Sequence, residues 1–404
     1  MRKSLSCLLI VLSGLLLTNL PTENAAAANP EQVTHFFAGG SDGGDPYGSL
    51  IMDERGNFYG TTAGGGGGTE CGSGTDGCGT VYKLSRGQVT VLYAFAGGSD
   101  GYYPRKGLFL DSQVNLYGTT TNGGESDLGT VFRLAPDGTK TTLHSFSGGS
   151  DGSFPSTDLV PDVEGNLYGT TLNGGGGSCP DGCGTLFSIT PEGQESMTYS
   201  FKGANQGDGA APAGGLVMDL EGNFYGATYH GGNNSCSGGG CGTVFKVTPQ
   251  GAETVLYKFA GGTDGNSPNG DLIMDESGNL YGTTSLGGSS TINGTVFKVT
   301  PDGTHSVLYS FRGGTDGSLP SAGLIADTQG NLYGTTSLGG DHNFGVVFKV
   351  APNGREKILH SFAGGSTDGW DSRASLTMDR KGNLYGTTIL GGTANRGTVF
   401  QVKN

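Results

Sequence analysis

Histidine is the side chain best suited to acid–base chemistry near neutral pH, and this 404-residue chain has six of them. Only His230 and His342 fall in segments that the sequence predicts as long loops between strands, where a general base or metal ligand could be built. No nucleophile elbow, phosphate-binding loop or zinc-helix motif accompanies them. We therefore treat His230 and His342 as weak catalytic candidates, and the sequence leans towards a protein that is not an enzyme.

A second set of candidates is a recurring aspartate that directly precedes a glycine. A ring of such carboxylates could bind calcium, which takes oxygen ligands. Each side chain could instead stabilise its own turn beside a glycine in a left-handed conformation. A single acid in each loop, without the dense pattern of an EF-hand, favours the turn, so these are weak metal candidates and no cofactor other than calcium is considered. The seven residues are Asp42, Asp100, Asp151, Asp208, Asp264, Asp316 and Asp368.

Aromatic residues close to a cation form the third set. Trp370 is the only tryptophan and Arg373 lies just beyond it, while Tyr102, Tyr103 and Phe154 occupy corresponding places in other copies of a repeat. Such side chains can stack on sugar rings or anchor a protein partner. Two interpretations stay open: a ligand site, or shielding of the outer loop layer.

The elements that must position these residues come from an internal repeat, which is the first feature to look for in a chain of this composition. Aligned on Asn-aromatic-Tyr or Asn-Leu-Tyr, seven copies appear at spacings of 58, 51, 57, 56, 52 and 52 residues. The alignment tyrosines are Tyr59, Tyr117, Tyr168, Tyr225, Tyr281, Tyr333 and Tyr385. The three long spacings are those that contain a pair of cysteines.

One copy shows the expected unit. Residues 272–275, 279–284, 294–299 and 306–311 read as four strands, A to D, bounded by Gly, Pro, Asn and Asp. Four antiparallel strands in about 50 residues are typical of a propeller blade. The sequence begins with an isolated D-like strand at 33–37 and ends with a C strand at 397–402. We therefore predict a seven-bladed β-propeller of residues 29–404, closed by the N-terminal outer strand in the last blade.

Recurrence also separates scaffold from function. Residues shared by all copies, such as Asn279 in the A–B turn and Gly282 after the tyrosine, are expected to serve turns and packing. Function should lie where the copies differ. The long B–C and D–A connections share one face, so we expect any site there, near the central channel.

The repeat resembles known families across nearly the whole chain. The Asp-x-x-Gly-Asn-Leu-Tyr turn at 327–333 looks like the NHL-type propeller repeat. The fuller pattern, with Gly-Thr-Thr, a Gly-Gly loop, Gly-Thr-Val-Phe-Lys-Val and Phe-x-Gly-Gly-x-Asp-Gly, is similar to the GloVer tandem-repeat family of exported bacterial proteins. The resemblance implies the fold and export, and it supplies no reaction.

The N-terminus and the cysteines indicate where the protein works. A basic start, an apolar stretch at 8–17 and four alanines at 25–28 predict a cleaved signal peptide of residues 1–28, and hence a secreted or periplasmic protein. In an exported protein, close cysteine pairs predict disulfides. The pairs are Cys71/Cys78, Cys179/Cys183 and Cys236/Cys241. A formal net charge of −14 argues against nucleic acid and anionic lipid as partners, and no further segment predicts a membrane span.

Two functions from different classes remain. The first is a non-catalytic binding module for an extracellular glycan or another exported protein. The second is a carbohydrate-active enzyme, a polysaccharide lyase or glycoside hydrolase, with its site on the long-loop face. The sequence names neither the ligand nor the oligomeric state.

Overall fold

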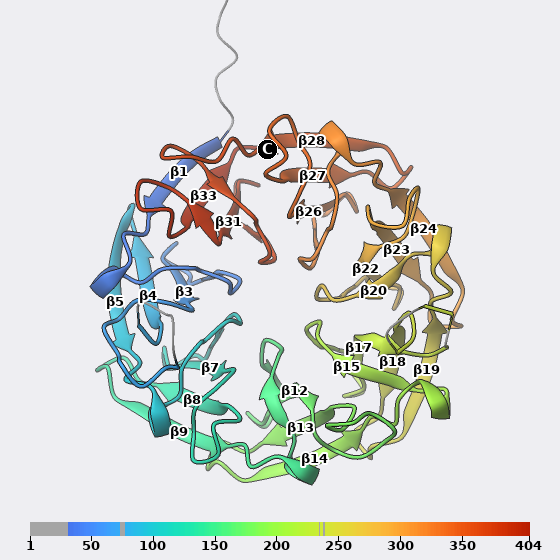
Figure 1. Cartoon of the computed structure of the whole chain (residues 1–404), viewed down its shortest axis with the longest axis horizontal. Helices are drawn as coiled ribbons and strands as arrows, with labels where there is room; N and C mark the ends of the chain where they lie inside the picture. The colour runs from blue at the N-terminus through green and yellow to red at the C-terminus, as the bar shows by residue number, and fades with distance from the viewer. Residues whose placement is uncertain (1–30, 73–76, 234, 237–238) are drawn as a thin grey trace, which may run out of the picture.

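The computed structural model describes residues 31–72, 77–233, 235–236 and 239–404. The predicted signal peptide lies outside these residues. Seven small antiparallel sheets stand in a ring around a central opening (Figure 1). The prediction of a seven-bladed β-propeller with four-stranded antiparallel blades is confirmed.

The strands of each blade run from the channel outwards in chain order. Blade 1 contains β2 (Ile51–Met52), β3 (Phe58–Thr62), β4 (Thr80–Ser85) and β5 (Gln88–Ala94). Blade 2 contains β6 (Phe109–Leu110), β7 (Leu116–Thr120), β8 (Thr130–Leu134) and β9 (Lys140–Ser145). Blade 3 contains β10 (Ser153–Pro155), β11 (Val160–Pro161), β12 (Leu167–Asn173), β13 (Thr185–Ile189) and β14 (Glu195–Ser200). Blade 4 contains β15 (Gly209–Pro212), β16 (Val217–Met218), β17 (Phe224–Gly231), β18 (Thr243–Val247) and β19 (Glu253–Lys258).

Blades 5 to 7 follow the same order. Blade 5 contains β20 (Asn266–Pro268), β21 (Ile273–Met274), β22 (Leu280–Leu286), β23 (Thr295–Val299) and β24 (His305–Ser310). Blade 6 contains β25 (Ile325–Ala326), β26 (Leu332–Thr336), β27 (Val346–Val350) and β28 (Glu356–Ser361). Blade 7 contains β29 (Gly369–Trp370), β30 (Thr377–Met378), β31 (Leu384–Thr388), β32 (Leu390–Gly391), β33 (Thr398–Val402) and β1 (Glu31–Phe36).

Short 3₁₀ helices interrupt the connections between blades. They are η1 (Gly40–Asp42), η2 (Gly98–Asp100), η3 (Gly149–Asp151), η4 (Ala204–Gln206), η5 (Gly262–Asp264) and η6 (Gly314–Asp316).

The innermost strand is divided in two, which the sequence did not predict. In blade 5, β20 pairs with the end of β22 at Asn266↔Leu286, and β21 pairs with its start at Ile273↔Tyr281. Residues 269–271 between the two pieces leave the sheet. The single strand expected at 272–275 is therefore only the second half of the inner strand, and the break brings three residues of each blade towards the axis.

Neighbouring blades pack through one repeated aromatic contact. The phenylalanine that follows each outer strand is fully buried and meets, edge to face, the aromatic ring of strand C in the next blade. The seven ring–ring distances are 5.0–5.3 Å, a favourable geometry for aromatic pairs. The pairs are Phe37–Tyr82, Phe95–Phe132, Phe146–Phe187, Phe201–Phe245, Phe259–Phe297, Phe311–Phe348 and Phe362–Phe400.

The glycine after each alignment tyrosine makes room for this ring. A Cβ atom on Gly282 would lie 2.7 Å from Cζ of Phe297 and 2.6 Å from Cδ2 of Leu272. The prediction that this glycine serves packing is confirmed.

The A–B turn is held by an aspartate that accepts four hydrogen bonds. Oδ1 of Asp275 accepts from the backbone of Ser277 and Asn279, and Oδ2 accepts from Nδ2 of Asn279 and the hydroxyl of Tyr281. Burial acts to raise the pKa of Asp275, but these bonds outweigh it and lower the pKa. The scaffold role of the recurring asparagine is confirmed.

The two ends of the described chain meet in blade 7. Strand β1 pairs antiparallel with β33 from Glu31↔Val402 to Phe36↔Thr398, and so supplies the outer strand that the C-terminal part lacks (Figure 1). The next residue, Phe37, is fully buried against Tyr82 of blade 1.

Candidate functional site

A cavity of about 420 Å³ lies where the broken inner strands meet, and residues from all seven blades line it. The lining residues come mainly from the three positions after the proline of each inner strand, a place that Ser372 takes in blade 7. Tyr47, Arg105, Asn269, Ser321 and Arg373 occupy the first of these positions in their blades, and Ser49, Asp158, Asp271 and Ser375 occupy the third.

The residue before the proline fixes this arrangement. In all seven copies it has a positive φ, between 52° and 60°, although none is glycine: Asp45, Tyr103, Phe154, Ala211, Ser267, Leu319 and Asp371. Its N–H donates to the previous blade, as from Phe154 to the carbonyl of Leu128 at 2.8 Å. The turn is common to all blades, so it belongs to the scaffold, whereas the side chains after it differ.

Hydrogen bonds join these inner turns around the axis. The N–H of Gly107 donates to Oδ1 of Asp158 at 2.7 Å, and the N–H of Gly215 donates to Oδ1 of Asp271 at 2.6 Å. The hydroxyl of Ser375 donates to Oδ2 of Asp271 at 2.7 Å, which links blade 7 to blade 5. The lining is therefore held in place by contacts from one blade to another.

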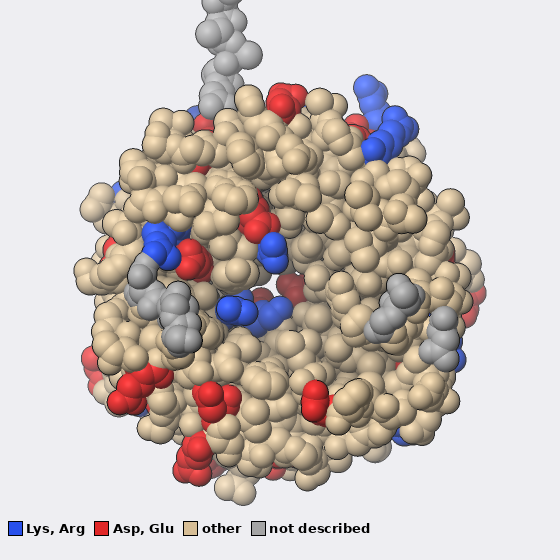
Figure 2. Space-filling model, in the orientation of Figure 1, with Lys and Arg blue, Asp and Glu red and all other residues tan. Residues whose placement is uncertain are grey.

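Positive charge gathers at this cavity in a protein that is acidic as a whole. Figure 2 shows Lys and Arg side chains around the central opening, on a face that is mostly uncharged. The cations that line the cavity are Arg105, Lys106 and Arg373. Both arginines are exposed, whereas Lys106 is half-buried and its Nζ donates to the carbonyl of Ala213 at 3.3 Å.

Aromatic rings and a carboxylate orient the two arginines. The guanidinium of Arg105 lies 5.3 Å from the ring centre of Tyr47 and 5.1 Å from that of Tyr103, within the range of cation–π attraction. Nε of Arg373 donates to Oδ1 of Asp371 at 2.9 Å. The arginines are thus presented to the cavity with part of their hydrogen-bonding capacity free for a ligand.

One carboxylate on the cavity wall differs from an ordinary surface acid. Burial, together with the negative charge of Asp271, raises the pKa of Asp158 to about 7, against a smaller lowering by Lys106. This pKa lies above the usual range of aspartate.

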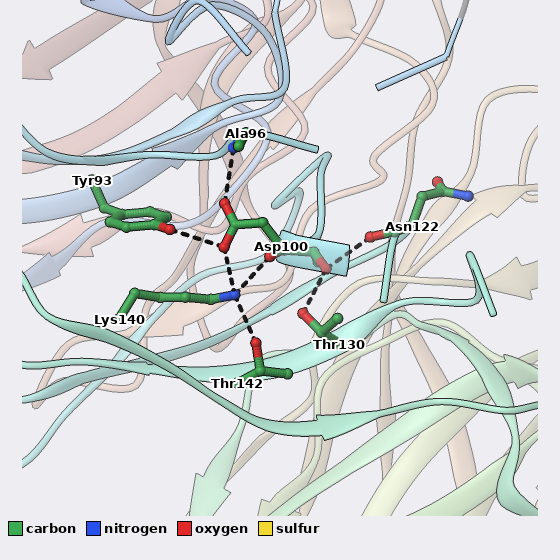
Figure 3. Close-up of polar contacts among 8 residues, drawn as sticks. Tyr93, Ala96, Asp100, Asn122, Thr130, Lys140 and Thr142 are labelled. Carbon is green, nitrogen blue, oxygen red and sulfur yellow. Dashed lines mark hydrogen bonds and ion pairs between the residues drawn. The ribbon is translucent and has the colours of Figure 1, made fainter. Parts of the chain in front are cut away.

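The recurring aspartates before glycine form a clamp in every blade. In the example of Figure 3, Asp100 accepts hydrogen bonds from the hydroxyl of Tyr93 at 2.8 Å and from the N–H of Ala96 at 2.8 Å, and Lys140 of the next blade donates to it at 2.9 Å. Both carboxylate oxygens are engaged by the protein. This geometry favours the turn interpretation over calcium binding for Asp100.

The same clamp accounts for four histidines. His35, His144 and His360 take the place of Tyr93 in their blades and lie 2.8–3.3 Å from Asp42, Asp151 and Asp368. His305, at the start of β24, lies 3.1 Å from Asp264 and stacks on Tyr257. These histidines connect strands and lie outside the central cavity.

Of the predicted ligand-binding residues, only Arg373 lines the cavity. Tyr103 contacts Arg105, while its hydroxyl donates to the carbonyl of Cys71 at 2.9 Å. Tyr102 is 8 % exposed and packs edge to face on Tyr103, which leaves little of its ring for a ligand.

Two other predicted aromatic residues, Trp370 and Phe154, are not among those that line the cavity. Trp370 packs against Phe344, 5.5 Å between ring centres, and its Nε1 donates to Oδ1 of Asn395. Phe154 is half-buried at a position equivalent to Tyr103. The structure therefore does not bring the predicted aromatic set together at one site.

The two catalytic candidates, His230 and His342, lie in different places and have different surroundings. His230 is not in a loop but at the end of β17, where it pairs with Ala210. It lines a groove of about 310 Å³ between blades 3 and 4, next to the disulfide Cys179–Cys183, and burial lowers its pKa. His342 is exposed in the connection between β26 and β27. No contact joins the two histidines among the described residues.

The three predicted disulfides are present, as Cys71–Cys78, Cys179–Cys183 and Cys236–Cys241. Each lies in the connection between the second and third strands of its blade, as the spacing of the repeats predicted. Among the described residues, no helix is long and apolar enough to cross a bilayer.

Sequence reasoning missed Tyr47, Arg105, Lys106, Asp158 and Asp271. A signal for them was available, because the seven copies carry residues of different types at the position after the proline, or after Ser372 in blade 7. That position holds Tyr47, Arg105, Ser156, Ala213, Asn269, Ser321 and Arg373. What the sequence lacked was the break in the inner strand, which turns these residues towards the axis.

Comparison with known proteins identifies the repeat. A family model described as the Gloeobacter/Verrucomicrobia repeat matches residues 24–238 and 235–404. A search of curated protein sequences finds no match.

Solved structures resemble the chain in fold. One is the extracellular domain of a proposed hybrid two-component system from B. thetaiotaomicron, with a TM-score of 0.54 and 15 % identity over 90 % of this chain. The chain spans 41 % of the length of that structure. Another is a proposed 6-phosphogluconolactonase from Bacteroides uniformis, with a TM-score of 0.50 and 16 % identity over 77 % of this chain and 83 % of the other. At these identities the likeness shows the propeller fold alone.

Proposed function

The chain belongs to the Gloeobacter/Verrucomicrobia repeat family, and from the channel that its repeats form we propose that it is an exported module that binds an anionic glycan. The observation that carries the proposal is the set of three cationic side chains, Arg105, Lys106 and Arg373, on one cavity of a chain with a net charge of −14. Nothing in the packing of the blades requires cations there, since other copies carry Ser, Ala or Asn at the arginine positions.

The chemistry of the lining matches an acidic sugar. A guanidinium binds a carboxylate through two parallel hydrogen bonds, and an aromatic ring such as Tyr47 can stack on the apolar face of a pyranose. A cavity of about 420 Å³ is within the size range of small-ligand sites. It accommodates the end of a glycan better than a folded protein surface, which makes a glycan the favoured ligand class.

Export is supported by three observations together. The sequence predicts a signal peptide, the three disulfides are typical of oxidising compartments, and one solved structure with the same fold is an extracellular domain. A periplasmic and a secreted location are equally compatible with them.

The proposal is tested by binding of acidic and neutral oligosaccharides of equal length, measured by titration calorimetry. Arg105→Ser and Arg373→Ser place at each site the residue that Ser156 and Ser321 provide in other blades, so folding is preserved. Loss of one charge-assisted contact, worth about 1.5–3 kcal/mol, is expected to weaken binding by about 10- to 100-fold. Binding should also weaken as salt is raised.

The matched control is Arg380→Ser in the exposed turn after β30, which should leave binding unchanged. Equal affinity for acidic and neutral sugars would reject the proposal. So would variants at Arg105 and Arg373 that bind as well as the control.

A polysaccharide lyase or glycoside hydrolase is the second candidate, because Asp158 and Asp271 share the cavity wall and the pKa of Asp158 is raised to about 7. Carboxyl groups whose pKa values are driven apart are typical of general acid and base pairs. An acid of this pKa would be protonated, and active, mainly below neutral pH.

This candidate predicts release of reducing or unsaturated sugar ends from an acidic polysaccharide, abolished in Asp158→Asn and declining above about pH 7. His230→Ala and His342→Ala are the comparison variants. Activity lost in His230→Ala and retained in Asp158→Asn would move the reaction to the groove between blades 3 and 4. Absence of any product from the full panel would leave the binding module.

A further inference from the structure

The junction of blades 6 and 7 contains a buried cluster of three side chains that could bind a metal ion. Glu31 at the start of β1, His360 in β28 and Asp368 in the connection between the blades place one ligand atom each within 4.8 Å of one another. All three residues are nearly inaccessible, at 9 %, 9 % and 7 % exposure. They are nitrogen and oxygen donors from three separate segments, and they converge on one point.

Two atoms aimed into this cluster lack a hydrogen-bond partner among the described residues. Oε1 of Glu31 and Nε2 of His360 are both buried without a well-formed bond, although Nε2 lies 3.3 Å from Oδ2 of Asp368. A buried polar atom without a partner destabilises the fold, so a native protein normally satisfies it. The cluster is therefore incomplete as it stands.

From this geometry we infer that Glu31, His360 and Asp368 bind a divalent transition-metal ion at the junction of blades 6 and 7. An imidazole with two carboxylates suits zinc and related ions, whereas calcium needs six to eight oxygen ligands. Two ligands of a tetrahedral zinc ion, each about 2.0–2.1 Å from it, lie about 3.3–3.4 Å apart. The separation of His360 and Asp368 is 3.3 Å.

Electrostatics favour the same occupant. Burial and the charge of Asp368 raise the pKa of Glu31 to about 7, because two carboxylates in one buried place repel each other. A divalent cation removes that repulsion and binds Nε2 of the neutral imidazole. Oδ2 of Asp368 also accepts from the N–H of Ala363, and Oδ1 from the N–H of Gly369, which hold the carboxylate in position.

The other blades provide internal comparisons. The position of His360 is a tyrosine in four blades, and the position of Glu31 is Val89 in blade 1 and Lys140 in blade 2. His144, Asp151 and Glu195 form a similar cluster, but it is half-buried and its histidine already has a 2.8 Å hydrogen bond to Asp151. The cluster at blades 6 and 7 is thus the better metal site.

A metal ion at this site would stabilise the junction between blades 6 and 7. Glu31 belongs to the N-terminal strand that completes blade 7, and His360 belongs to the outer strand of blade 6. An ion between them ties β1 to the neighbouring blade in addition to its pairing with β33. Metal binding should therefore raise thermal stability.

The experiment uses the full chain, purified without a polyhistidine tag, and zinc as the sole added metal. Zinc binding is measured by calorimetry, cobalt substitution by visible absorption, and stability by the melting temperature with and without zinc. The test variants are His360→Tyr, which installs the residue present at that position in four blades, and Glu31→Gln, which removes the charge of the carboxylate. The matched controls are His144→Tyr and Glu356→Gln, made in the same strand positions of other blades.

The expected result is that the wild type binds zinc, melts several degrees higher with it, and gives the absorption of a cobalt–imidazole site. Both test variants should weaken binding by about tenfold or more and lose the zinc-dependent rise, while the controls keep both. Binding that survives in His360→Tyr and Glu31→Gln would overturn the inference. So would binding lost only in His144→Tyr, or no binding by the wild type.

Discussion

At the scale of single residues, the clearest packing constraint is the glycine after each alignment tyrosine, because any side chain at that position would collide with its neighbours. Gly282 faces the tip of Phe297, and this arrangement recurs in every blade, with Tyr82 in blade 1. The ring of strand C is itself half of the contact between blades. The glycine therefore affects the packing within its own blade and also the contact with the neighbouring blade.

Gly282→Ala is expected to lower the free energy of unfolding by about 1–3 kcal/mol, because the new methyl group overlaps Phe297 and Leu272. Denaturant unfolding measures the change. Gly176→Ala is the control, since its Cβ would meet only Oγ of Ser200 at an ordinary 3.6 Å. Equal stability of the two variants would mean that the sheet yields at no cost, contrary to the packing described above.

At the scale of elements, most outer strands carry an ionisable residue at their start that faces an aspartate in the connection before their blade. In blade 4 this position is Glu253, which faces the buried Asp208 of the preceding connection. Burial, and then the charge of Asp208, raise the pKa of Glu253 to about 7. A carboxyl with a raised pKa stabilises the fold fully below its unfolded pKa of about 4.5, and this contribution is lost as the pH rises through about 7.

Glu253→Gln removes the group whose ionisation opposes folding. The melting temperature of this variant, relative to the wild type, should therefore increase by a few degrees between pH 5 and pH 8. Scanning calorimetry at both pH values gives the difference. Glu276→Gln, at an exposed turn position, should show no such trend, and a Glu253 variant that behaves like it would refute the assignment.

The elements also show how far the sequence could lead. Strands B, C and D were predicted to within two residues at nearly every boundary, because Asn-Leu-Tyr, Gly-Thr-Val-Phe and the Pro-Asp-Gly turn recur with fixed spacing. Of the inner strand, only the second piece, Ile273–Met274, was predicted, whereas the first piece, Asn266–Pro268, was missed because three residues show no periodicity. The sequence showed only part of the clamp. Either histidine or tyrosine occupies one position in every blade, but the partner aspartates lie seven to nine residues further along the chain.

The candidate site could not be predicted without knowledge of the break in the inner strand. Arg373 was identified because it stands next to the only tryptophan, whereas Arg105 and Asp158 lie in segments that read as ordinary connections. Their meeting at the axis follows from the broken inner strand and from the ring, and both are properties of the assembled blades. Local patterns predicted the parts of the propeller better than the place where those parts converge.

At the scale of the molecule, the ring depends on β1. Removing residues 29–40 deletes the outer strand of blade 7 and leaves the edge of β33 unpaired. It also removes Phe37, and truncation of a buried phenylalanine alone costs about 3–5 kcal/mol. We expect the melting temperature to fall by at least about 10 °C, measured by circular dichroism.

A chain that begins at Glu31 provides the control, since it keeps β1 intact. Its melting temperature should equal that of the chain beginning at residue 29. If a chain lacking residues 29–40 has the same melting temperature as these two chains, blade 7 is stable without its outer strand.

The pairing of β1 with β33 also sets an order of events during biosynthesis. The ribosome makes β1 before β33, and more than 360 residues separate the two strands, so β1 cannot pair with β33 until that strand has been made. Until then the edge of β1 stays uncovered, in a state that chaperones bind and proteases cleave. A polypeptide released before β33 is made would therefore lack the partner that β1 requires.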